Sequence, residues 1–283
     1  MATRKESTLR AQWLGAQLKE LRTAAGMTLD EAGEYLQRNP GTVSRFESAE
    51  YPIRRGDLLA LLDLYGVSQG RERKDLMRLA EDVWQKGWWD GYADVVDQRF
   101  IDYPWLETRA ERICVYSAML VPGQMQTRDY AEAVIRNAAE PGTSEEQIDR
   151  WITFRTQRQR VLDDAGATQL SVVLDESTLH RQIGGSTIFH NQLRHLVQVS
   201  QRPNIEVRVL PFSVGTHPGL DGTFDLFRMP APYPDVALVD SLAGNVFVES
   251  PGSERFVRAY DRLVAMSASP KQSVKLISAA MEE

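Results

Sequence analysis

The chain has 283 residues, of which 42% are hydrophobic and 25% are charged, and its formal net charge is −6. This length favours two domains, and this composition excludes a wholly disordered protein. The sequence has no apolar run of the roughly 18 residues that a membrane helix needs, which excludes an integral membrane protein. The polar start at residues 1–10 lacks a secretion signal, and the single cysteine, Cys114, excludes a disulfide framework. We therefore expect a cytoplasmic protein, in which any nucleic-acid binding comes from a local patch.

Turn signals divide the first part of the chain into short helices. Apolar residues recur at the spacing of one helix face over 14–25, and Gly26 ends this helix. Thr28 and Glu31 have the spacing of a capping box, which predicts the start of a second helix. Asn39-Pro40 is the next start signal, with Asn as the N-cap and Pro at the first helical position. Two capped helices and a short turn thus predict a helix-turn-helix motif.

The second helix of this motif is predicted to have one buried and one exposed face. Val43 and Phe46 are expected to share a core with Ala32 and Leu36 of the preceding helix, and Gly33 is small where the two helices should cross. The residues that this helix would project outward are Gly41, Thr42, Ser44, Arg45 and Ser48. A helix presented in this way fits the major groove of B-DNA, where its N-terminal residues reach base edges.

Two further helices are predicted before the second domain. Residues 58–65 are apolar on nearly all sides and end at Gly66, which is typical of a buried or dimerising helix. Residues 71–86 are charged with apolar residues on one face, and we expect them to form a helical connector. The predicted organisation is therefore a DNA-binding domain at 1–70, the connector, and a regulatory or partner-binding domain at 87–283.

Residues 14–65 resemble the helix-turn-helix domain of Cro and the phage repressors, and the stretch TVSRFE closely matches its recognition helix. The resemblance implies a mainly α domain of five helices that binds double-stranded DNA. It also implies that Arg22 pairs with Glu47 at the end of the recognition helix, so that neither residue contacts DNA. The chain departs from the family at Gln37, where a glycine is frequent in the turn. A residue other than glycine at positive φ costs about 1 kcal/mol.

A second departure concerns the residues that would contact DNA. Pro40 and Gly41 stand where the family often has long polar side chains, and neither offers a side-chain hydrogen bond. Base recognition would then fall mainly on Thr42, Ser44 and Arg45, of which Arg45 can donate two hydrogen bonds to a guanine. Flanking arginines suit the phosphates. The full set of residues expected at the DNA is Thr28, Arg38, Asn39, Gly41, Thr42, Ser44, Arg45, Ser48, Arg54 and Arg55.

The charge of this first domain is balanced overall. Residues 1–70 hold nine Lys or Arg and nine Asp or Glu, whereas residues 36–56 hold four arginines against two glutamates. The positive charge is therefore local, and a single copy should bind DNA weakly. We expect a homodimer that contacts two half-sites.

The remainder of the chain is expected to be α+β. Alternating apolar residues predict strands at 113–121, 170–174, 205–210, 223–228, 236–240 and 245–249. Helices are predicted at 127–138, 144–164, 177–182, 187–201 and 253–282. The pattern does not give the order of the strands in the sheet.

This region also resembles the C-terminal part of actinobacterial regulators of the WhiJ-like, antitoxin-like group, which are Xre-like proteins with a C-terminal domain of unknown function. The residues that carry the resemblance are Gly87-Trp88-Trp89, Leu106-Glu107, Val121-Pro122-Gly123-Gln124, Leu174-Asp175-Glu176, Arg202-Pro203-Asn204, Leu210-Pro211-Phe212 and His217-Pro218-Gly219. The resemblance implies a small partner protein encoded nearby, which would control the DNA-binding domain.

The sequence gives little support for an enzyme, a cofactor or a metal site. It has no nucleophile elbow, no phosphate-binding loop and no zinc-protease motif. His190 and His195 are five residues apart and so do not share a helix face. Cys114 lies in a predicted apolar strand, which favours a buried thiol over a nucleophile. Asp175-Glu176 at a strand end is more typical of a cap on the next turn than of a catalytic pair.

An aromatic-rich segment and one loop are the candidate effector or partner region. Trp88, Trp89 and Tyr92 could line a pocket together with later aromatic residues, although a domain core explains them more simply. His217 lies in a loop before a strand, where a turn is the plainer interpretation.

The residues together predict a dimeric, sequence-specific transcriptional regulator. The alternative is an antitoxin-like interaction protein that sequesters a small protein from a neighbouring gene, with DNA binding secondary.

Overall fold

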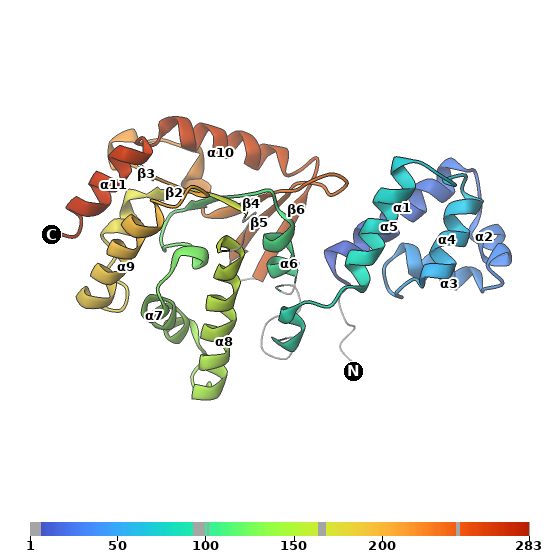
Figure 1. The fold of residues 1–283 in the computed structure, drawn as a ribbon, viewed down its shortest axis with the longest axis horizontal. Helices are drawn as coiled ribbons and strands as arrows, with labels where there is room; N and C mark the ends of the chain where they lie inside the picture. Colours follow the sequence, from blue (N-terminus) through green and yellow to red (C-terminus); the bar gives the residue numbers. More distant parts are fainter. Residues whose placement is uncertain (1–6, 93–99, 101, 164–167, 242–243, 283) are drawn as a thin grey trace. The chain divides into compact units, whose positions relative to one another are not determined.

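The computed structural model describes residues 7–92, 100, 102–163, 168–241 and 244–282. It divides the chain into two compact units, Met1–Asp90 and Gly91–Glu283. The elements described in unit 1 are helices, whereas unit 2 contains a sheet with helices, as the sequence predicted (Figure 1). Within the described ranges, no helix combines the length and apolar character needed to span a bilayer.

Unit 1 is the predicted five-helix domain. Its helices are α1 (Leu9–Ala24), α2 (Leu29–Tyr35), α3 (Pro40–Glu47), α4 (Arg55–Leu64) and α5 (Arg71–Trp84). The predicted capping signals are confirmed, because the Thr28–Glu31 capping box starts α2 and the Asn39 side chain caps α3. Gly26 follows α1 with a φ of +68°, which is the left-handed conformation that glycine adopts readily.

The fifth helix lies outside residues 14–65, in the segment that was expected to be a connector. Helix α5 packs against α1 and buries Leu76, Leu79 and Ala80. Arg10 donates a hydrogen bond to the carbonyl of Asp82 at 3.0 Å. The apolar face of α5 therefore makes this helix a structural part of unit 1.

Unit 2 is built on one six-stranded mixed sheet, in the order β3-β2-β1-β4-β5-β6. Its strands are β1 (Arg112–Ser117), β2 (Gln169–Asp175), β3 (Ile205–Leu210), β4 (Phe224–Arg228), β5 (Val236–Ser241) and β6 (Gly244–Glu249). Strands β1, β2 and β3 are parallel, and β4 to β6 continue the sheet from β1 in antiparallel pairs. All six lie where they were predicted, with shifts of up to four residues at their ends.

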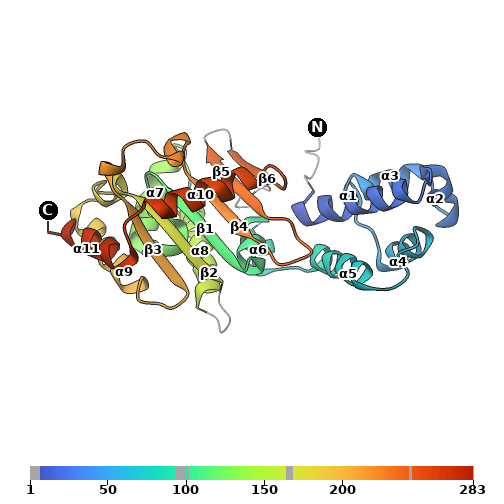
Figure 2. The ribbon, with the colours of Figure 1, turned by 90° about the horizontal axis from the view of Figure 1, so that it is seen from above.

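Helices cover both faces of this sheet. The helices of unit 2 are α6 (Asp102–Arg109), α7 (Arg128–Ala138), α8 (Glu145–Arg158), α9 (Ser186–Val199), α10 (Glu254–Met266) and α11 (Pro270–Ala279). Helix α10 lies on one face, with α7 and α8 on the other (Figure 2). On the α10 face, Tyr260 and Leu263 pack against Cys114, Val173 and other buried strand residues. The core of unit 2 therefore consists of two layers, one on each face of the sheet.

Short 3₁₀ segments connect these elements. They are η1 (Trp88–Tyr92), η3 (Gly123–Met125), η4 (Gln159–Leu162), η5 (Glu176–Leu179), η6 (Phe212–Val214) and η7 (Pro218–Asp221). Two of the predicted helices differ from those in the structure. The segment 177–182 contributes only to the single turn η5, because Gly184 and Gly185 at positive φ follow it. The predicted helix 253–282 is two helices, because a Ser269–Gln272 capping box starts α11.

The outer edge of strand β3 is covered by the segment that leads into α11. Ala268 donates its backbone N–H to the carbonyl of Val209 at 2.9 Å, and the N–H of Val209 donates to the hydroxyl of Ser273 at 2.9 Å. These bonds use backbone groups that an exposed edge strand would leave free.

Candidate DNA-binding interface

The turn between α2 and α3 sets the angle at which α3 is presented. A Cβ atom on Gly33 would lie 3.0 Å from the carbonyl oxygen of Arg38 and 3.1 Å from the nitrogen of Pro40. The predicted need for a small residue at this crossing is therefore confirmed. Gln37 has a φ of +54°, also as predicted, and its side chain is exposed. The turn thus brings the start of α3 directly against α2.

A partly buried ion pair holds the other end of α3. The guanidinium of Arg22 donates to both carboxylate oxygens of Glu47, at 2.6 and 3.0 Å, and to the carbonyl of Met27 at 2.7 Å. The hydrogen bond to Glu47 raises the pKa of Arg22. A Cβ on Gly15 would lie 2.4 Å from the carbonyl oxygen of Glu47, so α1 and the end of α3 are in close contact. Arg22 and Glu47 are therefore structural, as the resemblance implied.

Helix α3 has one face in the core and one face exposed. Val43 and Phe46 are buried, as is Ala32 on the neighbouring helix α2. The predicted outward residues are Gly41, Ser44, Arg45 and Ser48, which are exposed, and Thr42, which is half-buried. The exposed face is therefore polar and carries one long hydrogen-bond donor.

Two of the residues predicted at DNA take part in helix caps. The hydroxyl of Thr28 accepts from the N–H of Glu31 at 3.2 Å and donates to the Glu31 carboxylate at 2.8 Å. Asn39 accepts the N–H of Gly41 on its side-chain oxygen at 2.8 Å. Both side chains are exposed, so they mark the N-termini of α2 and α3 at the surface.

The flanking arginines are exposed and only loosely paired. Arg38 lies 3.4 Å from the carboxylate of Asp57, and Arg55 lies 3.5 Å from that of Glu81. Arg54 is the N-cap residue of α4 and is exposed. Exposed ion pairs of this kind contribute about 0–1 kcal/mol to the free energy of unfolding. These arginines can therefore exchange a carboxylate for a phosphate at little cost.

Arg45 is held by an aromatic ring that the sequence reasoning missed. Its guanidinium carbon lies over the ring of Tyr51, 5.0 Å from the ring centroid, and its Nη1 donates to the Tyr51 hydroxyl at 3.4 Å. Tyr51 is 48% exposed. The two residues are six positions apart, on either side of a helix end, so helical spacing gave no signal of this contact.

The candidate effector residues lie in different surroundings. Trp88 and Trp89 belong to unit 1, with ring centroids 5.9 Å apart. Tyr92 belongs to unit 2, where it packs on Phe154 at 5.1 Å. The later aromatic residues of this segment include Tyr103 and Trp105, which are buried in the core of unit 2.

His217 begins a turn in unit 2. Its Nδ1 accepts the N–H of Gly219 at 3.2 Å, and its Nε2 lies 3.9 Å from a carboxylate oxygen of Asp175. Asp175 itself accepts the N–H of Ser177 at 3.0 Å, which is the capping role predicted for it. The imidazole of His217 therefore stabilises the start of η7.

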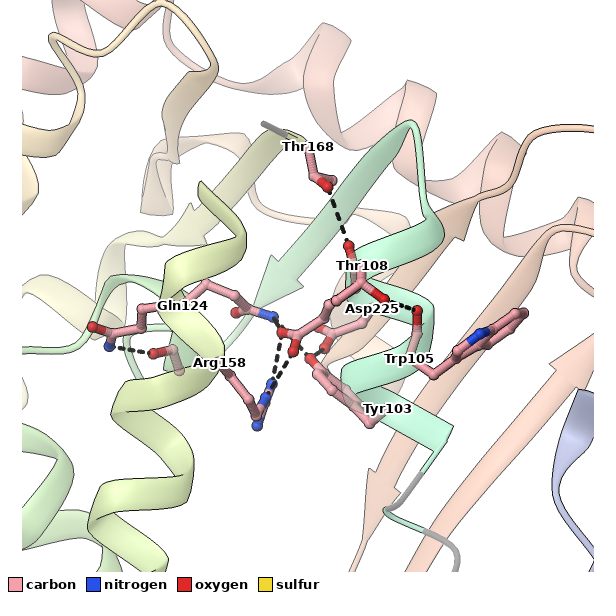
Figure 3. A network of polar contacts seen from close by, with 10 residues as sticks. Tyr103, Trp105, Thr108, Gln124, Arg158, Thr168 and Asp225 are labelled. Atoms are coloured by element: carbon pink, nitrogen blue, oxygen red, sulfur yellow. Dashed lines mark hydrogen bonds and ion pairs between the residues drawn. The ribbon is translucent and has the colours of Figure 1, made fainter. Parts of the chain in front are cut away.

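A buried polar network in unit 2 was not predicted (Figure 3). Arg158 donates to both carboxylate oxygens of Glu107 at 2.9 Å, and its guanidinium lies 4.0 Å from the ring centroid of Tyr103. Gln124 donates to Glu107 at 3.0 Å and to the Tyr103 hydroxyl at 2.9 Å. The Tyr103 hydroxyl in turn donates to Asp225. Helices α6 and α8, η3 and strand β4 are thus joined through charged and polar groups.

Burial changes the acidity of this network. Arg158 and Glu107 have side chains that are 7% and 1% exposed, and their charges compensate each other. Burial raises the pKa of Asp225 to about 6. Burial, followed by the charge of Asp225, raises the pKa of Tyr103 well above its usual value. The network therefore links the core of unit 2 to pH through Asp225.

The other chemical candidates are accounted for by structure. Cys114 is buried, and burial raises the pKa of its thiol to about 11, which keeps it protonated at neutral pH. In the part of the chain that the structure describes, no three His, Cys, Asp or Glu residues are grouped so that they could hold a metal ion.

The fold of unit 1 and the exposed polar face of α3 define the class of helix-turn-helix DNA-binding regulators. Residues 13–76 match the family model described as a helix-turn-helix domain. Residues 100–279, more than half of the chain, match the model described as a domain of unknown function, DUF5753, and the chain therefore belongs to the DUF5753 family. A search of curated proteins and a search of solved structures each gave no match. The actinobacterial, WhiJ-like and antitoxin-like assignments stay predictions.

Proposed function

We propose that the protein is a cytoplasmic transcriptional regulator that recognises a specific site on double-stranded DNA through α3. The observation that carries this proposal is the division of α3 into two faces, since Val43 and Phe46 fix the helix to the core while its polar face stays exposed. The pair between Arg22 and Glu47 supports it, because it anchors the end of α3 without using any exposed group.

In this proposal α3 enters the major groove. Arg45 donates two hydrogen bonds to the O6 and N7 atoms of a guanine, and Thr42 and Ser44 make shorter contacts. Gly41 has no side chain, so the backbone of α3 can approach the DNA closely, and Ser48 lies at the far end of the contact. These residues would supply the sequence preference.

The residues around α3 would contact the phosphates. Arg38, Arg54 and Arg55 are exposed cations beside the recognition helix. Asn39 stands at the N-terminus of α3, where backbone N–H groups and the helix dipole favour an anion, and Thr28 would present its exposed hydroxyl at the start of α2. Such contacts fix the position of the protein on DNA and contribute equally to the affinity for all DNA sequences.

We further propose that two chains bind together and that unit 2 receives the regulatory signal. Residues 1–70 carry equal numbers of acidic and basic side chains, so one copy has few phosphate contacts and two half-sites would be needed for useful affinity. The signal would be a small partner protein encoded nearby or a ligand, with Trp88, Trp89, Tyr92 and His217 as the candidate region. The proposal includes no enzymatic reaction, cofactor or metal.

The test is selection of DNA by the full-length protein. The protein is incubated with a pool of random-sequence duplexes, and the bound fraction is sequenced. We expect an enriched palindrome, and light scattering should give the mass of two chains on each selected duplex. A protein that enriches no sequence would overturn the proposal. If that protein instead retains a small protein encoded by a neighbouring gene, the antitoxin-like alternative is favoured.

A further inference from the structure

The contact between Arg45 and Tyr51 joins two side chains that both face outward. Arg45 is exposed and Tyr51 is 48% exposed, so the pair adds little to the buried core of unit 1. The guanidinium nevertheless has a defined place, 5.0 Å from the ring centroid and with a hydrogen bond to the Tyr51 hydroxyl. A long cationic side chain on the surface normally samples many rotamers, so this arrangement calls for a reason other than folding.

The backbone after α3 places Tyr51 beside Arg45. The carbonyl oxygen of Arg45 accepts the N–H of Glu50 at 2.9 Å and that of Tyr51 at 3.1 Å. This return is possible because Ala49 has a φ of +56°, an uncommon conformation for a residue with a side chain. The chain is therefore folded back onto the residue whose side chain the ring then contacts.

The residues that follow fix Tyr51 from the other side. Pro52 restricts the backbone of Tyr51 to extended conformations. Ile53 is buried at 4% exposure, and its carbonyl accepts the indole N–H of Trp84 at 2.9 Å. The backbone of Tyr51 is thus held between a turn bonded to Arg45 and a strongly anchored residue, which places its ring beside the Arg45 side chain.

We propose that Tyr51 is the positioning residue for base recognition by Arg45, an inference that rests on the proposed DNA-binding function. The ring holds the planar guanidinium before DNA arrives, so less side-chain entropy is lost when Arg45 pairs with a base. The contact places the guanidinium carbon over the ring and uses one N–H group. The remaining N–H groups are available for a two-bond contact with guanine.

The experiment compares four variants of the full-length protein: Arg45→Ala, Tyr51→Phe, Tyr51→Leu and the double variant Arg45→Ala/Tyr51→Leu. The matched control is Tyr35→Leu, since Tyr35 is a tyrosine of unit 1 with similar exposure (54%) and lies on α2. Each protein selects from the random duplex pool, and base preference is read at every position. Unfolding midpoints are measured in parallel to exclude loss of folding.

We expect Tyr51→Leu to lower the preference about two- to fivefold, at the same base pair whose preference Arg45→Ala abolishes. Tyr51→Phe keeps the ring and should change this preference less than twofold. In the Arg45→Ala background, Tyr51→Leu should have no further effect, and Tyr35→Leu should leave the preference unchanged.

A measurement on the free protein tests the geometry without DNA. The side-chain protons of Arg45 should show a ring-current shift to high field in the wild type and in Tyr51→Phe, and lose it in Tyr51→Leu. The absence of this shift in the wild type would overturn the proposal.

Two selection outcomes would also overturn it. If Tyr51→Leu weakens binding to all DNA sequences alike, with or without Arg45, then Tyr51 contacts DNA itself and does not act through Arg45. If Tyr51→Leu folds normally and changes nothing, the ring has no role in recognition. A wild-type protein that enriches no DNA overturns the proposed function as well, whereas either of the two outcomes above leaves that function standing.

Discussion

The two units each contain a bidentate pair between arginine and glutamate, and the two pairs support different kinds of structure. Arg22 and Glu47 tie α1 to the end of a helix whose other face is exposed and polar. Arg158 and Glu107 lie inside a network that joins four elements of a core. The same chemistry thus holds a surface ready for contact in unit 1 and stabilises an interior in unit 2. Buried charge alone does not indicate a functional site.

The largest effect that tests this comparison is expected in unit 2. Glu107→Gln removes the charge that compensates Arg158 while keeping the side-chain shape, and should destabilise unit 2 by about 3–5 kcal/mol. Hydrogen exchange at the amides of β1 during a denaturant series would measure this change. The control is Glu145→Gln, in an exposed pair with Arg136, which should leave the stability of unit 2 nearly unchanged. Equal losses in the two variants would contradict the structural role of the network.

Asp225 should make the stability of unit 2 depend on pH. Its pKa is raised from 3.8 to about 6, so the folded state binds the proton more tightly than the unfolded chain does. The stability from this group is fully present below about pH 4 and is lost as pH rises through 6, a change of about 3 kcal/mol. In Asp225→Asn this loss of stability should disappear. The free energy of unfolding of the variant should therefore rise relative to that of the wild type between pH 4 and pH 7. Unfolding curves at several pH values would show it, and a constant difference would contradict the buried carboxyl.

In unit 1, Glu47→Ala should separate stability from DNA contact. Removal of the two hydrogen bonds to Arg22 should lower the free energy of unfolding by about 1.5–3 kcal/mol. The thermal midpoint of unit 1 should fall, while at temperatures where the variant is folded its base preferences should match those of the wild type. A change in base preference in the folded variant would mean that Glu47 is itself at the DNA.

The smallest expected effect distinguishes base contacts from phosphate contacts. Arg45→Ala should cost about 1–3 kcal/mol on the preferred site and relax the preference at one base pair. Arg54→Ala should weaken binding to all DNA sequences alike. It should also reduce the slope of log binding constant against log salt concentration by about one unit. Titrations of labelled duplexes at several salt concentrations give both quantities. The assignment fails if the two variants have the same profile.

Local signals in the sequence predicted most of the elements but not their pairing. The caps at Thr28 and Asn39 depend on residues within three positions, and alternation within a strand depends only on neighbours, so both can be read along the chain. The order of the sheet depends on contacts between distant segments, which these local patterns do not reveal. The pair between Arg22 and Glu47 was expected only through the resemblance to a known family.

For the candidate sites too, features set by neighbouring residues were predictable and features set by distant contacts were not. The exposed face of α3 was predictable because a helix with a known core face must expose the other. The contact of Tyr51 with Arg45 was missed because it depends on the unusual backbone of Ala49. The buried network was missed because its partners are far apart, with 122 positions between Tyr103 and Asp225.

The covering of the β3 edge has a consequence for synthesis of the protein. Ser273 lies 64 residues beyond Val209, so the ribosome makes β4, β5, β6 and α10 before the edge can be closed. During that interval the nascent sheet presents an open parallel edge, which is a template for pairing with other chains. Chains released before Ala268 would therefore keep this edge open permanently and should be found with chaperones or in aggregates.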